Sequence, residues 1–245
     1  MMGTTQRKGY IALRIPKVLA MSERVVRMDD LTWNGSEVAL EFRLTYEGPL
    51  FASNFGRDTQ PARKDHKRKI RKIFHHQLKR LWEITPFLAR GDSGGPSVIS
   101  FEGGPDRPAT SVKALAARHA LYGFNFVPLV TAELQFSCWI DVLMLRRPPR
   151  GSLIQHGDVD NRLKTLFDCL TLPNGHQDYS KTPPQDDEKP FYCLLEDDRL
   201  ISKITVETDM LLEDLSTPPD DNDVRLLIAV RIKPLDPHLH NIQFS

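Results

Sequence analysis

The stretch GDVDNRLKTLFDCLTLP, residues 157–173, is the most informative part of this sequence about its architecture. Its apolar residues recur at helical spacing, and the stripe that such a helix buries consists of Leu163, Leu166, Phe167 and Leu170. Asp158 or Asp160 can cap the first turn, and Pro173 interrupts the pattern at the other end. We therefore expect a helix over residues 160–171.

Strand-like segments lie on both sides of this helix, because they are apolar and rich in β-branched residues. The predicted strands are residues 132–145, 191–195, 199–207 and 224–232. The predicted upstream elements are a hairpin over 23–46 around Asn34-Gly35 and amphipathic helices over 61–84 and 110–123. The sequence therefore predicts an α/β (α+β) fold, with one mixed-sheet domain and packed helices over residues 1–245. Two loop insertions are expected, near 85–130 and 173–190.

Composition and cysteine usage exclude several classes of protein. A chain of 245 residues that is 40% hydrophobic is long enough for one large domain with a core. Its three cysteines form no CxxC pair, which argues against a disulfide framework and a structural zinc site. No window approaches the roughly 18 apolar residues of a membrane span. We expect a cytoplasmic protein with no membrane partner.

The hexapeptide GDSGGP, residues 91–96, matches the nucleophile region of trypsin-like proteases. Only 92 residues precede Ser93, and the histidines among them lie inside a basic run that offers no context for proton relay. We interpret this segment as a loop rich in glycine and proline.

The net charge of +1 conceals a strongly basic run. Residues 61–82 hold nine lysines and arginines against one acid, Asp65. Such an imbalance favours contact with nucleic-acid phosphates, although solvated charge runs are also common. The candidate DNA-binding residues, with one arginine from the preceding loop, are Arg57, Arg63, Lys64, Lys67, Arg68, Lys69, Arg71 and Lys72.

Acidic residues gather at two places in the second half of the chain. Asp158, Asp160 and Asn161 lie at the start of the helix over 160–171, and Asp197 and Asp198 lie at a turn between strands. If the turn comes beside the helix start, the carboxylates repel one another and must share a proton or bind a cation. An all-oxygen site favours Mg²⁺ or Mn²⁺. Such an ion activates water for phosphodiester hydrolysis.

Lys164 follows Asp160 by one helical turn and could neutralise charge on a phosphate. Each of these residues also has an ordinary structural interpretation. Aspartate at a helix start is commonly a cap, Lys164 with Asp168 is commonly a surface ion pair, and an acidic pair in a turn is commonly solvated.

The D-x-D-N-x-x-K pattern of residues 158–164, followed by the helix LKTLFDCL and a DD turn that leads into a strand, resembles the RusA family of Holliday junction resolvases. The resemblance covers residues 37–82 and 131–233. It implies a small α/β domain that dimerises, binds branched DNA and cuts it with Mg²⁺ or Mn²⁺. The metal ligands that it implies are Asp158, Asp160 and Asp198, with Asp197 as a further ligand.

The resemblance also implies that Lys164 is the catalytic lysine and that Asn161 braces the helix start. The chain departs from the family pattern in two places. The segment between the helix and the DD turn is longer than is usual in the family, and residues 85–130 have no counterpart there. We therefore expect a homodimeric, metal-dependent DNA endonuclease that acts on branched DNA such as Holliday junctions. One alternative is a non-catalytic DNA-binding or assembly subunit of a larger phage, plasmid or defence complex. Another is a nuclease that acts on flaps, linear duplex or RNA.

Overall fold

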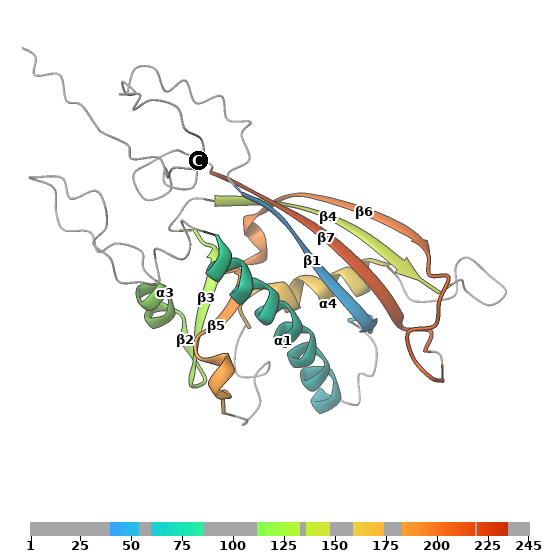
Figure 1. Cartoon of the computed structure of the whole chain (residues 1–245), viewed down its shortest axis with the longest axis horizontal. Coiled ribbons are helices and arrows are strands. Elements are labelled where there is room, and N and C mark those ends of the chain that lie inside the picture. The colour runs from blue at the N-terminus through green and yellow to red at the C-terminus, as the bar shows by residue number, and fades with distance from the viewer. Residues whose placement is uncertain are drawn as a thin grey trace, which may run out of the picture. The chain divides into compact units, whose positions relative to one another are not determined.

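A computed structural model describes residues 40–53, 60–85, 112–132, 136–147, 159–173, 183–218 and 220–234, all of which belong to one compact unit, Glu37–Ser245. Helices and strands are mixed along the chain, so the predicted α+β class is confirmed (Figure 1). The helices are α1 (Gln60–Ile84), α3 (Val112–Arg118) and α4 (Val159–Leu170), with short 3₁₀ turns at Asp186–Glu188 and Asp198–Leu200. The strands are β1 (Leu40–Pro49), β2 (Ala120–Leu121), β3 (Phe124–Val130), β4 (Phe136–Arg146), β5 (Phe191–Leu195), β6 (Ile201–Met210) and β7 (Asp223–Pro234).

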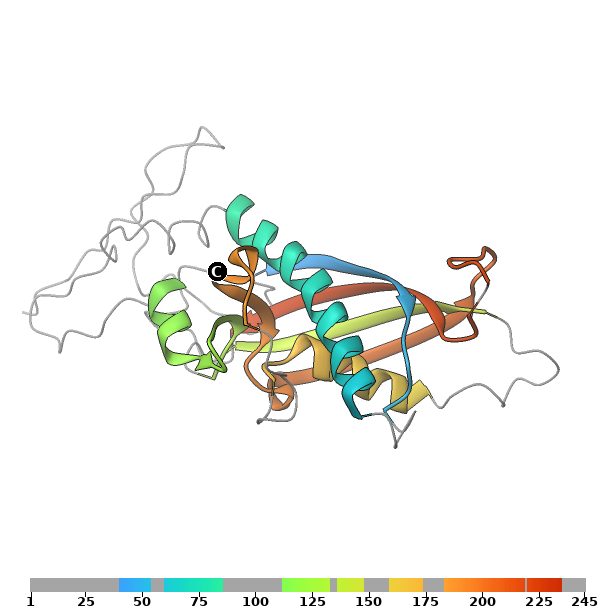
Figure 2. The ribbon, with the colours of Figure 1, turned by 90° about the horizontal axis from the view of Figure 1, so that it is seen from below.

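Four strands form the larger sheet in the order β1-β7-β4-β6. Strand β7 is antiparallel to both β1 and β4, whereas β4 and β6 are parallel. Parallel neighbours need a crossover connection, and α4 lies in the one that links β4 to β6. Helices α1 and α4 lie across one face of the sheet (Figures 1 and 2). That face carries the buried side chains Val142 and Met144 of β4, which alternate with the half-buried Asp141 and Leu143.

Helix α1 spans almost the residues that its apolar periodicity predicts. Ile70, Phe74, Leu78 and Trp82 follow one another at four-residue spacing, and all four are buried in the main core. Ile73, which the same periodicity assigns to the apolar face, is exposed instead. The helix is therefore anchored by a narrow apolar stripe, with polar residues on both of its flanks.

The smaller sheet has the order β2-β3-β5, with β2 and β3 antiparallel and β3 and β5 parallel. The predicted helix over 110–123 is shorter than expected, because α3 ends at Arg118 and the chain then enters a hairpin. At its tip, Tyr122 and Gly123 have φ values of 54° and 80°, which are typical of a tight hairpin turn and incompatible with a right-handed helix.

Within the stretch 85–130, which the sequence suggests is an insertion, residues 112–130 contribute to the hydrophobic core. Leu115 of α3 and Val127, Leu129 and Val130 of β3 are buried in the main hydrophobic cluster. Residues 112–130 are thus an integral part of the fold. The first strand of the predicted hairpin and the segment 91–96 lie outside the described residues, and β1 pairs with β7. No helix in the described part of the chain is long and apolar enough to cross a membrane.

Candidate functional site

The start of α4 is held firmly between two loops. Arg162, which is only 3% exposed, donates from Nη1 to the carbonyl oxygens of Leu50 at 2.9 Å and Asn222 at 3.3 Å. On the adjoining side of the helix, the Ser53 hydroxyl donates to Asn161 Oδ1 at 2.8 Å, and the Ser53 amide donates to the Asn161 carbonyl at 2.9 Å. Asn161 therefore braces the helix start.

The polar residues of the D-x-D-N-x-x-K pattern differ in their surroundings. Asp160 is exposed in the first turn of α4, where its Oδ1 accepts a hydrogen bond from the Asn161 amide at 2.8 Å. Lys164 is exposed one turn later, and its ammonium forms no ion pair with any described residue. Asp168 pairs instead with Lys67, at 2.7 Å. Asp158 lies outside the described residues.

Residues 196–198, here called the EDD turn, follow β5. Asp197 caps the short Asp198–Leu200 turn and accepts hydrogen bonds from the Arg199 amide and Nε, both at 2.9 Å, and from Nη2 at 2.8 Å. These bonds from Arg199 lower the pKa of the Asp197 carboxyl to about 2. Glu196 accepts a hydrogen bond from the Ala132 amide at 2.9 Å. Asp198 is exposed.

The start of α4 and the EDD turn lie at opposite ends of the helix. Thr171, which directly follows α4, forms a parallel bridge with Leu195, which directly precedes the EDD turn. The helix from Asp160 to Thr171 is about 16 Å long, at a rise of about 1.5 Å per residue. The carboxylates of Asp160 and of the EDD turn therefore do not converge within one chain. No group of three or more His, Cys, Asp or Glu residues in the described part could hold a metal ion.

This separation follows from the topology. Helix α4 begins near the ends of β4 and β1, as its contacts with Leu50 and Asn222 show, and returns along the sheet. Strand β6 then starts beside the start of β4, where Ile201 pairs with Cys138. Residues before and after a crossover helix must lie at opposite ends of a parallel strand pair.

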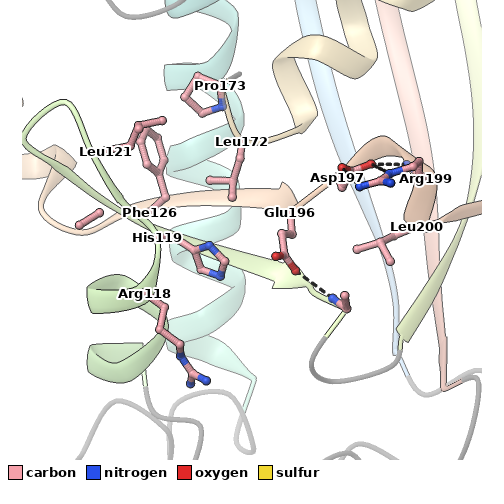
Figure 3. Close-up of a pocket in the computed structure, with 12 residues that line it drawn as sticks. Arg118, His119, Leu121, Phe126, Leu172, Pro173, Glu196, Asp197, Arg199 and Leu200 are labelled. Carbon is pink, nitrogen blue, oxygen red and sulfur yellow. Dashed lines mark hydrogen bonds and ion pairs between the residues drawn. The ribbon is translucent and has the colours of Figure 1, made fainter. Parts of the chain in front are cut away.

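A pocket of about 640 Å³ lies beside the EDD turn (Figure 3). Glu196, Asp197 and Arg199 line one side, and Arg118 and His119 line the other. Its apolar lining comes from Leu121, Phe126, Leu172, Pro173 and Leu200. Sequence reasoning missed Arg118 and His119, because both fell inside a segment that was predicted as one uninterrupted helix and no spacing connects them to the EDD turn.

The basic run on α1 is largely turned toward the protein. Lys67 pairs with Asp168 at 2.7 Å, and the buried Arg71 donates to the Asp168 carbonyl, also at 2.7 Å. Two further cations contact residues 185–188, here called the acidic turn: Arg68 lies 3.4 Å from Glu188 and Lys72 lies 3.2 Å from Asp187.

The remaining candidates for DNA contact are distributed differently. Arg63 donates to the Ser53 carbonyl. Lys69 is exposed and Lys64 is half-buried, and neither ammonium pairs with another described residue. Arg57 lies outside the described part of the chain. The outward face of α1 is therefore less basic than its sequence suggests.

No protein-family model, curated protein or solved structure matches this chain.

Proposed function

We propose that this protein is a cytoplasmic, metal-dependent DNA endonuclease. Its resemblance to the RusA family implies that it acts on branched DNA. The observation that carries the proposal is the state of the D-x-D-N-x-x-K pattern on α4. Asp160 and Lys164 lie one turn apart on a helix whose start is clamped by Arg162 and Asn161, and both side chains face solvent. A rigid helix start that presents an acceptor and a cation with no ion-pair partner among the described residues suits a site that must position a phosphodiester.

The proposed nuclease requires two chains. Within one chain, Asp160 and the EDD turn do not fit a single divalent ion, since they lie at opposite ends of α4. A two-fold dimer in which the two copies of α4 run antiparallel would bring the start of one helix to the EDD turn of the other. Mg²⁺ or Mn²⁺ held there would activate a water molecule and polarise the phosphate. The homodimer is thus part of the same proposal.

Cleavage of a labelled four-way junction and a matched linear duplex, with Mg²⁺, Mn²⁺ or EDTA, tests the activity. We expect metal-dependent nicking of the junction by the wild type and its loss in Asp160→Asn and Asp198→Asn. Asp186→Asn serves as a matched control, because this carboxylate is fully exposed and pairs only with Lys189 among the described residues. Retained cleavage by Asp160→Asn contradicts the assignment.

Mixing the two inactive variants tests whether the site is shared. In a mixed dimer, the Asp160→Asn chain supplies an intact Asp198, and the Asp198→Asn chain supplies an intact Asp160. After subunit exchange, about a quarter of the wild-type sites should reappear, because half of the dimers are mixed and each has one complete site. No recovery despite proven exchange would mean that each site is built within one chain.

A non-catalytic DNA-binding or assembly subunit is the second candidate. It is favoured by the separation of Asp160 from the EDD turn, because the described residues of one chain then form no cluster of carboxylates that could bind a metal ion. It predicts DNA binding that persists in EDTA and no cleavage with either metal. Flap, linear duplex and RNA substrates in the same assay distinguish a nuclease with another target.

A further inference from the structure

The acidic turn packs against the basic helix α1 at its central cations. Lys72 Nζ lies 3.2 Å from Asp187 Oδ2 and 3.7 Å from Glu188 Oε1, and it also donates to the Gln185 side chain. Arg68 Nη2 lies 3.4 Å from Glu188 Oε2. Two cations that composition assigns to DNA are thus already neutralised by carboxylates of the same chain.

The backbone of the acidic turn is fixed independently of these ion pairs. The buried His75 ring donates from Nε2 to the Asp187 carbonyl at 2.9 Å, while its Nδ1 accepts from the Tyr192 amide at 2.8 Å. Glu188, whose side chain is 1% exposed, accepts from the Gln185 amide at 2.9 Å. The Asp187 carboxylate projects from this fixed base, and its side chain remains 44% exposed.

Asp187 therefore lies where a DNA phosphate would have to bind if it were to contact Lys72. A carboxylate and a phosphodiester each carry one negative charge and both accept hydrogen bonds from an ammonium group. His76 Nε2 lies 3.9 Å from the same carboxylate oxygen, Asp187 Oδ2. A phosphate must displace Asp187 or forgo these contacts.

We propose that Asp187 competes with DNA phosphates for Lys72 and so weakens the binding of α1 to the DNA backbone. The inference rests on the proposed function, because it requires that α1 faces DNA. Backbone contacts contribute affinity for every DNA sequence and shape alike. Because Asp187 withholds one such contact, it should weaken binding to linear and branched DNA by the same factor.

The test compares Asp187→Asn with Glu83→Gln in binding assays at several salt concentrations in EDTA. Glu83 is a matched control, because it lies on α1, pairs with the exposed Arg80 at 3.1 Å, and adds the same unit of charge when neutralised. Asp187→Asn removes the nearest carboxylate from Lys72 and leaves Glu188 Oε1 at 3.7 Å. The slope of log K against log salt should therefore steepen by at most about 0.9, and the affinity for linear duplex should rise by at most about 8-fold at 0.1 M salt. Glu83→Gln should change both quantities much less, since exposed pairs are weak.

The double variant Asp187→Asn with Lys72→Gln identifies the cation that is released. It should lose the gain in affinity, whereas Lys72→Gln alone should alter binding of linear duplex little. Equal effects of Asp187→Asn and Glu83→Gln overturn the inference while leaving the proposed function intact. If neither the wild type nor Asp187→Asn binds any DNA, the inference and the proposed function are both overturned.

Discussion

Replacing Arg162 by methionine should destabilise the protein and loosen the start of α4. Methionine retains much of the length of the side chain but donates no hydrogen bond. The substitution leaves the Leu50 carbonyl without its 2.9 Å donor and removes two longer contacts to Asn222, at 3.3 and 3.4 Å. The structure therefore predicts a loss of folding free energy that is dominated by one short, charge-assisted bond.

The size of this loss can be bounded from the same contacts. A hydrogen bond from a charged group contributes about 1.5–3 kcal/mol, and the two longer bonds add little. Against this, burial lowers the pKa of Arg162, and its Nε is buried with no hydrogen-bond partner in the described part of the chain. Removing the guanidinium relieves that cost, so we expect a net loss of about 2 kcal/mol.

Thermal unfolding followed by circular dichroism measures the effect. A loss of about 2 kcal/mol corresponds to a decrease in Tm of roughly 4–8 °C for a chain of this size. Arg43→Met is the control, because Arg43 is 59% exposed and its contact with Glu41 is 3.6 Å long, and its Tm should stay close to that of the wild type. A Tm for Arg162→Met that equals the control would refute the reasoning that this arginine clamps α4.

Three further predictions concern the core. Phe74→Ala should cost about 3–5 kcal/mol in urea unfolding, because the ring is buried in the main core, and a cost below about 1 kcal/mol would contradict its packing. Burial lowers the pKa of His75 below its ordinary 6.5, so the contribution of the neutral ring to stability is complete above about pH 6.5 and is lost as the pH falls. The unfolding free energy of His75→Gln should therefore vary less with pH below 6.5 than that of the wild type. Burial raises the pKa of the Cys138 thiol to about 12 and raises that of Cys193 as well, so both should resist a thiol reagent in the native state and react once the chain is unfolded.

The long amphipathic elements could be predicted from the sequence because periodicity reports burial directly. The helix expected over 61–84 is observed as Gln60–Ile84, and the one expected over 160–171 is observed as Val159–Leu170. The strand at Phe124–Val130 was missed, because it follows a hairpin turn too short to interrupt an apolar pattern and contains Pro128. Its pairing with β5 joins residues 65 positions apart, such as Phe126 and Phe191, and no local pattern encodes such a long-range contact.

The candidate site shows the same limit more sharply. Local spacing correctly places Asp160 and Lys164 on one face of one helix, but whether the EDD turn joins them depends on the direction in which the chain returns. A helix between two parallel strands reverses the chain, so its flanking residues separate by the length of the helix, about 16 Å from Asp160 to Thr171. Asp160 and the EDD turn therefore cannot form one site unless a second chain brings its own EDD turn to Asp160.

The basic run illustrates why charge composition overstates a binding surface. Helical periodicity identifies which residues of α1 are buried. It does not identify which acidic residues from elsewhere in the chain form ion pairs with the cations beside the buried stripe. Lys67 pairs with Asp168 and Lys72 pairs with Asp187, and each aspartate lies more than 100 positions away in the sequence. These partners orient the cations inward and reduce the charge that α1 presents to a polyanion. If α1 binds DNA as proposed, its affinity should depend on the acidic turn as well as on the cations of the helix, because this turn pairs with Arg68 and Lys72. For this reason neutralising a single aspartate is expected to change the salt dependence of binding.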